Sequence, residues 1–183
     1  MSIGIVVLAA MTTTFIAQAK YYNAQEQVNA MQQTARAVAD LMTREISMAG
    51  YDPTGTAITA NNGIPYNASQ LQILADLDGN GTTTATDENI TYTYDASNLR
   101  IQRTTGGTTT TLANNIANFT FSYLDANGTA TTTTANIRQI QVSVTAQTSG
   151  SDPNYTSNNG YRTYQLTSLI TPKNLCYKGG SCP

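Results

Sequence analysis

The N-terminal end of the chain carries the feature that most restricts its fold, a long segment without charged side chains. No Asp, Glu, Lys or Arg occurs between Met1 and Ala19, and aliphatic residues dominate this stretch. A helix needs about 20 apolar residues to cross a bilayer. We therefore predict that residues 1–19 form a transmembrane helix, or one packed among other apolar helices; the alternative is a helix buried in a soluble domain. A cleaved signal peptide is disfavoured, because no basic residues precede the apolar run.

From residue 20 to residue 50 the sequence keeps a helical period but becomes amphipathic. Apolar side chains recur at spacings of three and four, which places them on one face of a helix. Gly50 and Pro53 then supply the usual chemistry of a helix end. We predict an amphipathic helix over residues 20–50 that continues the first segment, so that the whole helix is about 70 Å long. The residues expected to pack on a sheet are Val28, Met31, Ala35, Val38, Met42 and Ile46.

After Gly50 the apolar period changes to the strict alternation that is typical of half-buried β-strands. Turn dipeptides such as Asn80-Gly81 and Asn127-Gly128 separate the alternating segments. We predict that residues 51–183 form an antiparallel β-sheet domain that packs on the amphipathic helix, which makes an α+β fold. The expected strands cover residues 70–75, 88–94, 98–104, 109–112, 118–124, 137–146 and 162–170.

Composition excludes several classes of function. Charged residues make up 11% of the chain and the net charge is −2, so the clustered Lys and Arg that bind nucleic acid are missing. Histidine, the commonest general base, is absent as well. The acidic residues near positions 76 and 88 are the candidates for an acid–base pair, but they lie in a segment with the composition of an exposed loop. We expect a protein that is not an enzyme and does not bind nucleic acid.

Residues 76–88 have the spacing of a calcium loop, with oxygen ligands at its first, third and fifth positions and Gly81 at the sixth. Thr83 departs from the usual apolar residue at position eight, and Asp87 stands where Glu is usual. The alternative interpretation is a hairpin turn whose carboxylates face water. Calcium is the cofactor that this segment suggests, as a structural staple. The candidate ligands are Asp76, Asp78, Asn80, Thr82, Thr84, Asp87 and Glu88.

The two cysteines, Cys176 and Cys182, lie in the last eight residues of the chain, with two glycines between them. A disulfide between them would close a short loop, which suits an oxidising compartment such as a bacterial periplasm. Loop-closure entropy gives such a bond roughly 2 to 2.5 kcal/mol, so we expect it to hold the C-terminal tail. The alternative is two free thiols in a frayed end.

Several segments together resemble a PilW-like minor pilin, in the wider class of type IV pilins and type II secretion pseudopilins. The most specific is Arg44-Glu-Ile-Ser-Met-Ala-Gly-Tyr51 at the predicted helix end. The resemblance spans nearly the whole chain, and its other segments are the apolar opening at residues 1–11 and residues 26–33, 41–53, 76–81, 115–125, 137–144 and 169–175.

Members of this family begin with a basic leader, a prepilin peptidase site and an acidic residue near the mature N-terminus. Here position 5 is Ile5 and none of these features occurs. We expect the sequence to begin inside the usual mature helix, about ten residues from its start.

The resemblance implies a structural minor pilin that takes part in assembly or priming of a type IV pilus. Residues 1–19 would then be held in the inner membrane before assembly and lie in the filament core afterwards, with other pilin subunits as partners and the sheet domain in the periplasm. One alternative is a pseudopilin of a type II secretion system. An alternative of another class is a membrane-tethered, calcium-dependent binding or adhesion module.

Overall fold

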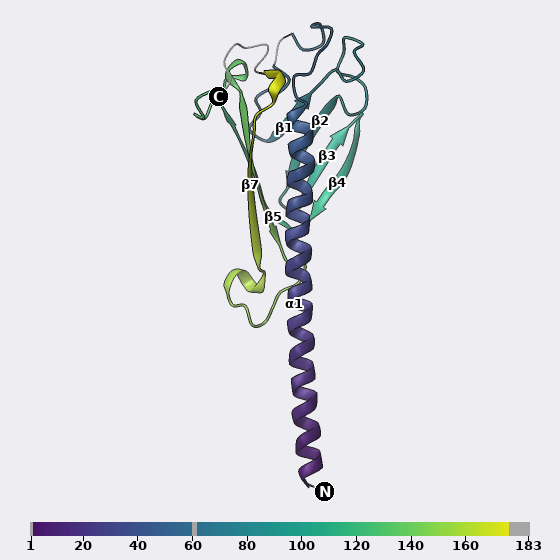
Figure 1. Cartoon of the computed structure of the whole chain (residues 1–183), viewed down its shortest axis with the longest axis vertical. Coiled ribbons are helices and arrows are strands. Elements are labelled where there is room, and N and C mark those ends of the chain that lie inside the picture. The colour runs from purple at the N-terminus through teal and green to yellow at the C-terminus, as the bar shows by residue number, and fades with distance from the viewer. Residues whose placement is uncertain (1, 60–61, 176–183) are drawn as a thin grey trace.

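The computed structural model describes residues 2–59 and 62–175, with side chains from residue 11 onward. A long helix runs through most of the height of the molecule, and two β-sheets flank its upper part (Figure 1). The elements are α1 (Ser2–Ser47), β1 (Gln70–Leu74), β2 (Asn89–Asp95), β3 (Arg100–Thr105), β4 (Thr108–Asn114), β5 (Ile116–Leu124), β6 (Gln139–Gln147) and β7 (Thr163–Ile170), with short 3₁₀ turns at Thr134–Asn136 and Ser157–Gly160.

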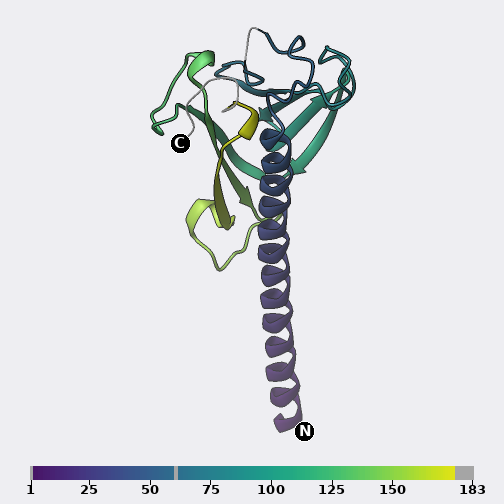
Figure 2. The same ribbon diagram turned by 45° about the horizontal axis from the view of Figure 1, so that its top comes forward.

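The N-terminal part of α1 extends well beyond the sheets as a rod (Figures 1 and 2). Helix α1 ends at Ser47, and the chain turns through Gly50, which has a φ of +77°. The amide of Gly50 donates to the carbonyl of Leu74 at 2.9 Å. A Cβ atom on Gly63 would lie 2.1 Å from the amide nitrogen of Gly50. Glycine is therefore required at position 63, because the helix end and the loop cross there at backbone distance.

The seven strands lie where the alternating pattern predicts them, within about two residues at most ends. They form two antiparallel sheets, with strand orders β1-β2-β3-β4 and β5-β6-β7. The predicted antiparallel β-sheet domain is thus present, but it consists of two sheets and not one. A single residue, Asn115 with a φ of +57°, joins β4 to β5. This left-handed residue turns the chain out of the first sheet, and β5 pairs with β6 instead of β4.

The core lies between α1 and the two sheets. The helix residues Met31, Ala35, Val38, Met42 and Ile46 are buried there, and Val28 packs against the same cluster while partly exposed. Strand residues of the first sheet meet them from one side and strand residues of the second sheet from the other. The fully buried strand side chains include Leu71, Ile90, Tyr92, Ile101, Ile116, Ile140 and Val144.

Substituting Val38 by Asp should lower the free energy of unfolding by about 3 kcal/mol or more, because the new carboxylate would be buried without a partner. Val38 is 2% exposed, whereas its neighbour Ala37 in the same turn is exposed. The matched variant Ala37→Asp should cost only the helix propensity difference, about 0.7 kcal/mol. Denaturant unfolding of the detergent-solubilised chain, followed by circular dichroism, measures both. Equal midpoints for the two variants would contradict the packing described.

Candidate functional site

Three carboxylates converge beside the helix end, in the loop between β1 and β2. Oxygen atoms of Asp76, Asp78 and Glu88 lie within 4.8 Å of one another. Asp76 is fully buried and Glu88 is 1% exposed, whereas Asp78 faces solvent. Glu88 immediately precedes β2 and has the same strand parity as Ile90, which directs its side chain to the buried face. The loop thus folds around two buried acids.

Backbone amides of the loop surround these acids. The amides of Leu77 and Ala85 donate to the two oxygens of Glu88, at 2.9 and 3.0 Å. Asp76 accepts from the amides of Asn80 at 3.1 Å and Gly81 at 3.0 Å. These bonds fix the carboxylates on the inside of the loop, since each oxygen is held by a short contact to the main chain.

Of the other candidate ligands, Asn80 stays beside the acids, since its side-chain amide donates to Asp78 at 2.9 Å, whereas Asp87 points away. Asp87 has a φ of +69°, and its carboxylate accepts from the guanidinium of Arg103 at 2.7 Å, away from the three converging acids. The Asn80 side chain accepts from the Thr82 amide and hydroxyl, and the Thr82 hydroxyl contacts that of Thr84 at 3.0 Å. The structure therefore brings together the three carboxylates, with Asn80 beside them, and separates Asp87 from them.

A buried ionic network ties α1 to the first sheet. Glu45 is 8% exposed, and its carboxylate accepts a short hydrogen bond from the hydroxyl of Tyr92. Arg103 on β3 pairs with the same carboxylate at 2.9 Å and with Asp87 at 2.7 Å. Burial, together with the hydrogen bond to Glu45, raises the pKa of Tyr92 well above its ordinary value. Glu45, Arg103 and Tyr92 thus lock the last turns of the helix to β2 and β3.

The sequence analysis did not single out this network. The signal was present, because Glu45 lies three residues after Met42 and seven after Val38, a spacing that puts it on the apolar face of α1. Its partner Arg103 is 58 residues away in the chain. Periodicity therefore predicts that Glu45 is buried, but gives no means of naming the cation that neutralises it.

Replacing Arg103 by Met should lower the free energy of unfolding by about 3 kcal/mol or more, because Glu45 would stay buried without its cation. A matched control lies on the same strand: Arg100 pairs with Asp95 at 2.9 Å, with side chains 34% and 21% exposed. Arg100→Met should cost about 1 kcal/mol or less, as usual for a more exposed pair. Urea unfolding of both variants measures the difference. If Arg103→Met unfolded at the same urea concentration as Arg100→Met, the assigned role of the buried pair would be wrong.

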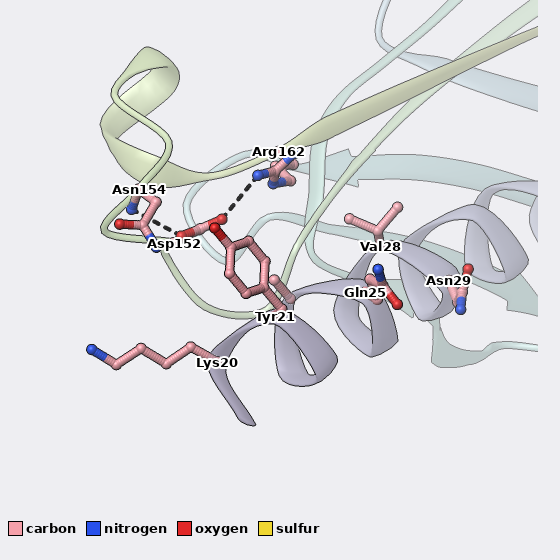
Figure 3. Close-up of a pocket in the computed structure, with 9 residues that line it drawn as sticks. Lys20, Tyr21, Gln25, Val28, Asn29, Asp152, Asn154 and Arg162 are labelled. Carbon is pink, nitrogen blue, oxygen red and sulfur yellow. Dashed lines mark hydrogen bonds and ion pairs between the residues drawn. The ribbon is translucent and has the colours of Figure 1, made fainter. Parts of the chain in front are cut away.

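A groove of about 380 Å³ opens on the flank of α1, between residues 20–29 and the loop that precedes β7 (Figure 3). Val28 lies at its base, and the Arg162–Asp152 ion pair closes one side at 2.9 Å. The hydrogen bond from Arg162 is the main cause of a lowered pKa of Asp152. The amide of Gly150 donates to the Gln27 side chain at 3.0 Å, which fastens this loop to the helix. The groove marks the point at which the sheets cease to cover α1.

Below this groove, α1 exposes large apolar side chains. Met11 is 64% exposed, Phe15 is 73% and Ile16 is 54%. Tyr21, which also lines the groove, and Tyr22 follow them at 66% and 72%. Single exposed apolar residues are common, but a contiguous set on one element is typical of a surface that another molecule covers. This part of α1 is therefore a candidate interface.

Residues 1–19 were expected to span a membrane. Among the helices of the described part of the chain, none has the length and apolar character needed to cross a bilayer. The expected span is not confirmed. The predicted disulfide between Cys176 and Cys182 lies outside the described residues.

Comparison with solved structures identifies the fold. A type IV-like pilin from Thermus thermophilus superposes with a TM-score of 0.51 at 14% identity, covering 79% of this chain and 97% of that one. At this identity the likeness shows the fold, which is that of a type IV pilin: a long N-terminal helix packed on antiparallel sheets. The predicted α+β, pilin-like fold class is confirmed.

The sequence then identifies the family. The family described as prepilin peptidase-dependent protein B matches residues 24–170, most of the chain, and the chain belongs to this family. The predicted pilin-type relationship is thereby confirmed. Comparison with curated proteins finds no match.

Proposed function

We propose that this chain is a structural subunit, a minor pilin, that takes part in assembly or priming of a type IV pilus. The observation that carries the proposal is the helix: the sheets bury one face of its upper half, and its lower half presents Phe15 and neighbouring apolar side chains to the surroundings. An uncovered apolar rod on a family fold of this kind suits packing against the helices of other pilin subunits. The role is structural and non-enzymatic.

The assembly path follows from the same surface. Before assembly, the inner membrane would hold the apolar part of α1, with the sheet domain in the periplasm. In the filament, neighbouring helices would cover that part instead, because leaving it exposed to water outside the membrane would cost roughly 25 cal/mol per Å² of apolar area. A pseudopilin of a type II secretion system is the alternative within the same class, and the identity of the partner subunits distinguishes the two.

Co-purification from detergent-solubilised membranes of the host tests this proposal. The parent chain should recover other pilin-like subunits, identified by mass spectrometry, as pilus or secretion proteins. Phe15→Asp should reduce their recovery at least about tenfold, since a charge would be placed in an apolar interface. Thr132→Asp, in an exposed loop of the sheet domain, is the matched control and should recover partners normally. Recovery without pilin-like partners, or a Phe15→Asp variant that recovers them fully, would contradict a filament role.

We also propose that the loop between β1 and β2 binds calcium as a structural staple. Oxygens bound to one calcium ion at about 2.3–2.6 Å lie at most about 5 Å apart, and the three carboxylate oxygens meet this limit at 4.8 Å. Among the described residues, none of the four ion pairs involves Asp76, Asp78 or Glu88. Three neighbouring carboxylates repel one another, so a hard cation among them would favour the folded loop.

Calcium in large excess over its dissociation constant should raise the unfolding free energy, by about 2.7 kcal/mol at a hundredfold excess. Asp78→Asn, which removes an exposed carboxylate, should weaken this effect at least about tenfold in calcium concentration. Asp125→Asn is the matched control, because Asp125 likewise accepts loop amides at 2.9 Å but lies in another turn. Thermal unfolding with calcium, magnesium or chelator measures the shift. If calcium left the melting temperature of the parent chain unchanged, the proposed calcium site would be contradicted, and the three acids would serve only to accept hydrogen bonds within the loop.

A further inference from the structure

The outer face of the first sheet carries uncharged polar side chains across all four strands. The registers align Gln72 with Thr91, Thr91 with Thr104 and Thr104 with Thr109, so that these four residues form one row across the sheet. The inner residues of the same strands, such as Ile90 and Ile101, are buried against α1. The row therefore faces away from the helix.

A depression of about 370 Å³ lies on this face. Gln72, Asn89, Thr91 and Thr104 form its floor, and its walls come from residues 83–85 and from the β3–β4 turn. All the side chains that line it are uncharged. Its volume is at the lower end of ligand-binding cavities, which suits roughly one or two sugar rings.

The floor offers both donors and acceptors. The Gln72 amide donates to the Asn89 side-chain oxygen at 2.9 Å, which leaves the Gln72 oxygen as an acceptor and the Asn89 amide as a donor. The Thr104 hydroxyl contacts that of Thr109 at 2.8 Å and retains further capacity, and the Thr91 hydroxyl adds another donor and acceptor. A row that alternates amides and hydroxyls matches a ligand with several neighbouring hydroxyl groups.

Charge decides which ligands fit. Phosphates, nucleotides and acidic peptides depend on cationic side chains, and the lining has none. An apolar ligand would leave the amides and hydroxyls of the floor without partners. We propose that this depression is a binding site for a neutral glycan, a function separate from packing of the helix in a filament.

The site is built before the ligand arrives. Its floor is held by strand pairing, and one wall is fixed because the Ala85 amide donates to Glu88 at 3.0 Å. The other wall turns through Gly106, where a Cβ atom would lie 3.0 Å from the Thr86 hydroxyl. Such a rigid site loses little entropy on binding. The lining has no aromatic ring for a sugar to stack on, so we expect a dissociation constant on the order of 1 mM.

Saturation-transfer difference NMR on the full chain tests the proposal, in a detergent whose head group is not a sugar. The probes are lactose, cellobiose and the N-acetylated disaccharide chitobiose, which distinguish plain hexoses from cell-wall-type amino sugars. At least one probe should receive saturation. The double variant Gln72→Leu/Thr91→Val, which removes hydrogen-bonding groups from the floor, should bind about tenfold more weakly.

Thr111→Val is the matched control, because Thr111 pairs with Gln102 on the same face and is not part of the lining. It should bind like the parent chain, and circular dichroism should show the same fold for all variants. Absence of saturation transfer to all three probes would overturn the proposal. Equal binding by the double variant and the parent would overturn it as well, since the ligand would then lie elsewhere.

Discussion

The apolar stripe on the upper half of α1 is the constraint on which the rest of the structure depends. Met42 and Ile46 are fully buried, and Val38 nearly so, between two sheets that each have only one apolar face. Burying such a side chain contributes roughly 1.5–3 kcal/mol. Neither a four-stranded nor a three-stranded sheet of this size has a core of its own, so both take theirs from the helix. The upper half of α1 is therefore the centre of the domain core, while its N-terminal half extends beyond the domain.

Polar contacts link the β1–β2 loop to the C-terminal end of α1. Asp87 and Glu88 are adjacent in sequence but have different partners. The Asp87 carboxylate pairs with Arg103, whereas the Glu88 carboxylate accepts hydrogen bonds from amides of the loop. Arg103 in turn contacts Glu45 on α1. The position of the β1–β2 loop is thus connected, through two neighbouring acids and one arginine, to the last turns of the helix.

Local periodicity was sufficient to predict the helix, its buried face and all seven strands, because each depends on residues that are near in sequence. The split into two sheets was not predictable in this way. It follows from the left-handed conformation of one residue, Asn115, which a pattern of alternating side chains does not encode. For the acidic loop, the sequence supplied seven candidate ligands, and only the path of the folded chain separates Asp87 from the three acids that meet. The Glu45–Arg103 pair was missed for a similar reason, since its two members are distant in sequence.

The geometry of α1 also determines how the domain would bear load. A pull on the N-terminal rod acts along the helix axis, and β7 runs alongside that axis (Figure 1). The helix would have to slide along the whole apolar stripe at once, and it would not peel away contact by contact. The Glu45–Arg103 pair lies near the end of α1 farthest from the pull, so it would break together with the apolar contacts and not before them. Tension along α1 would therefore load the contacts between the helix and the sheets in shear.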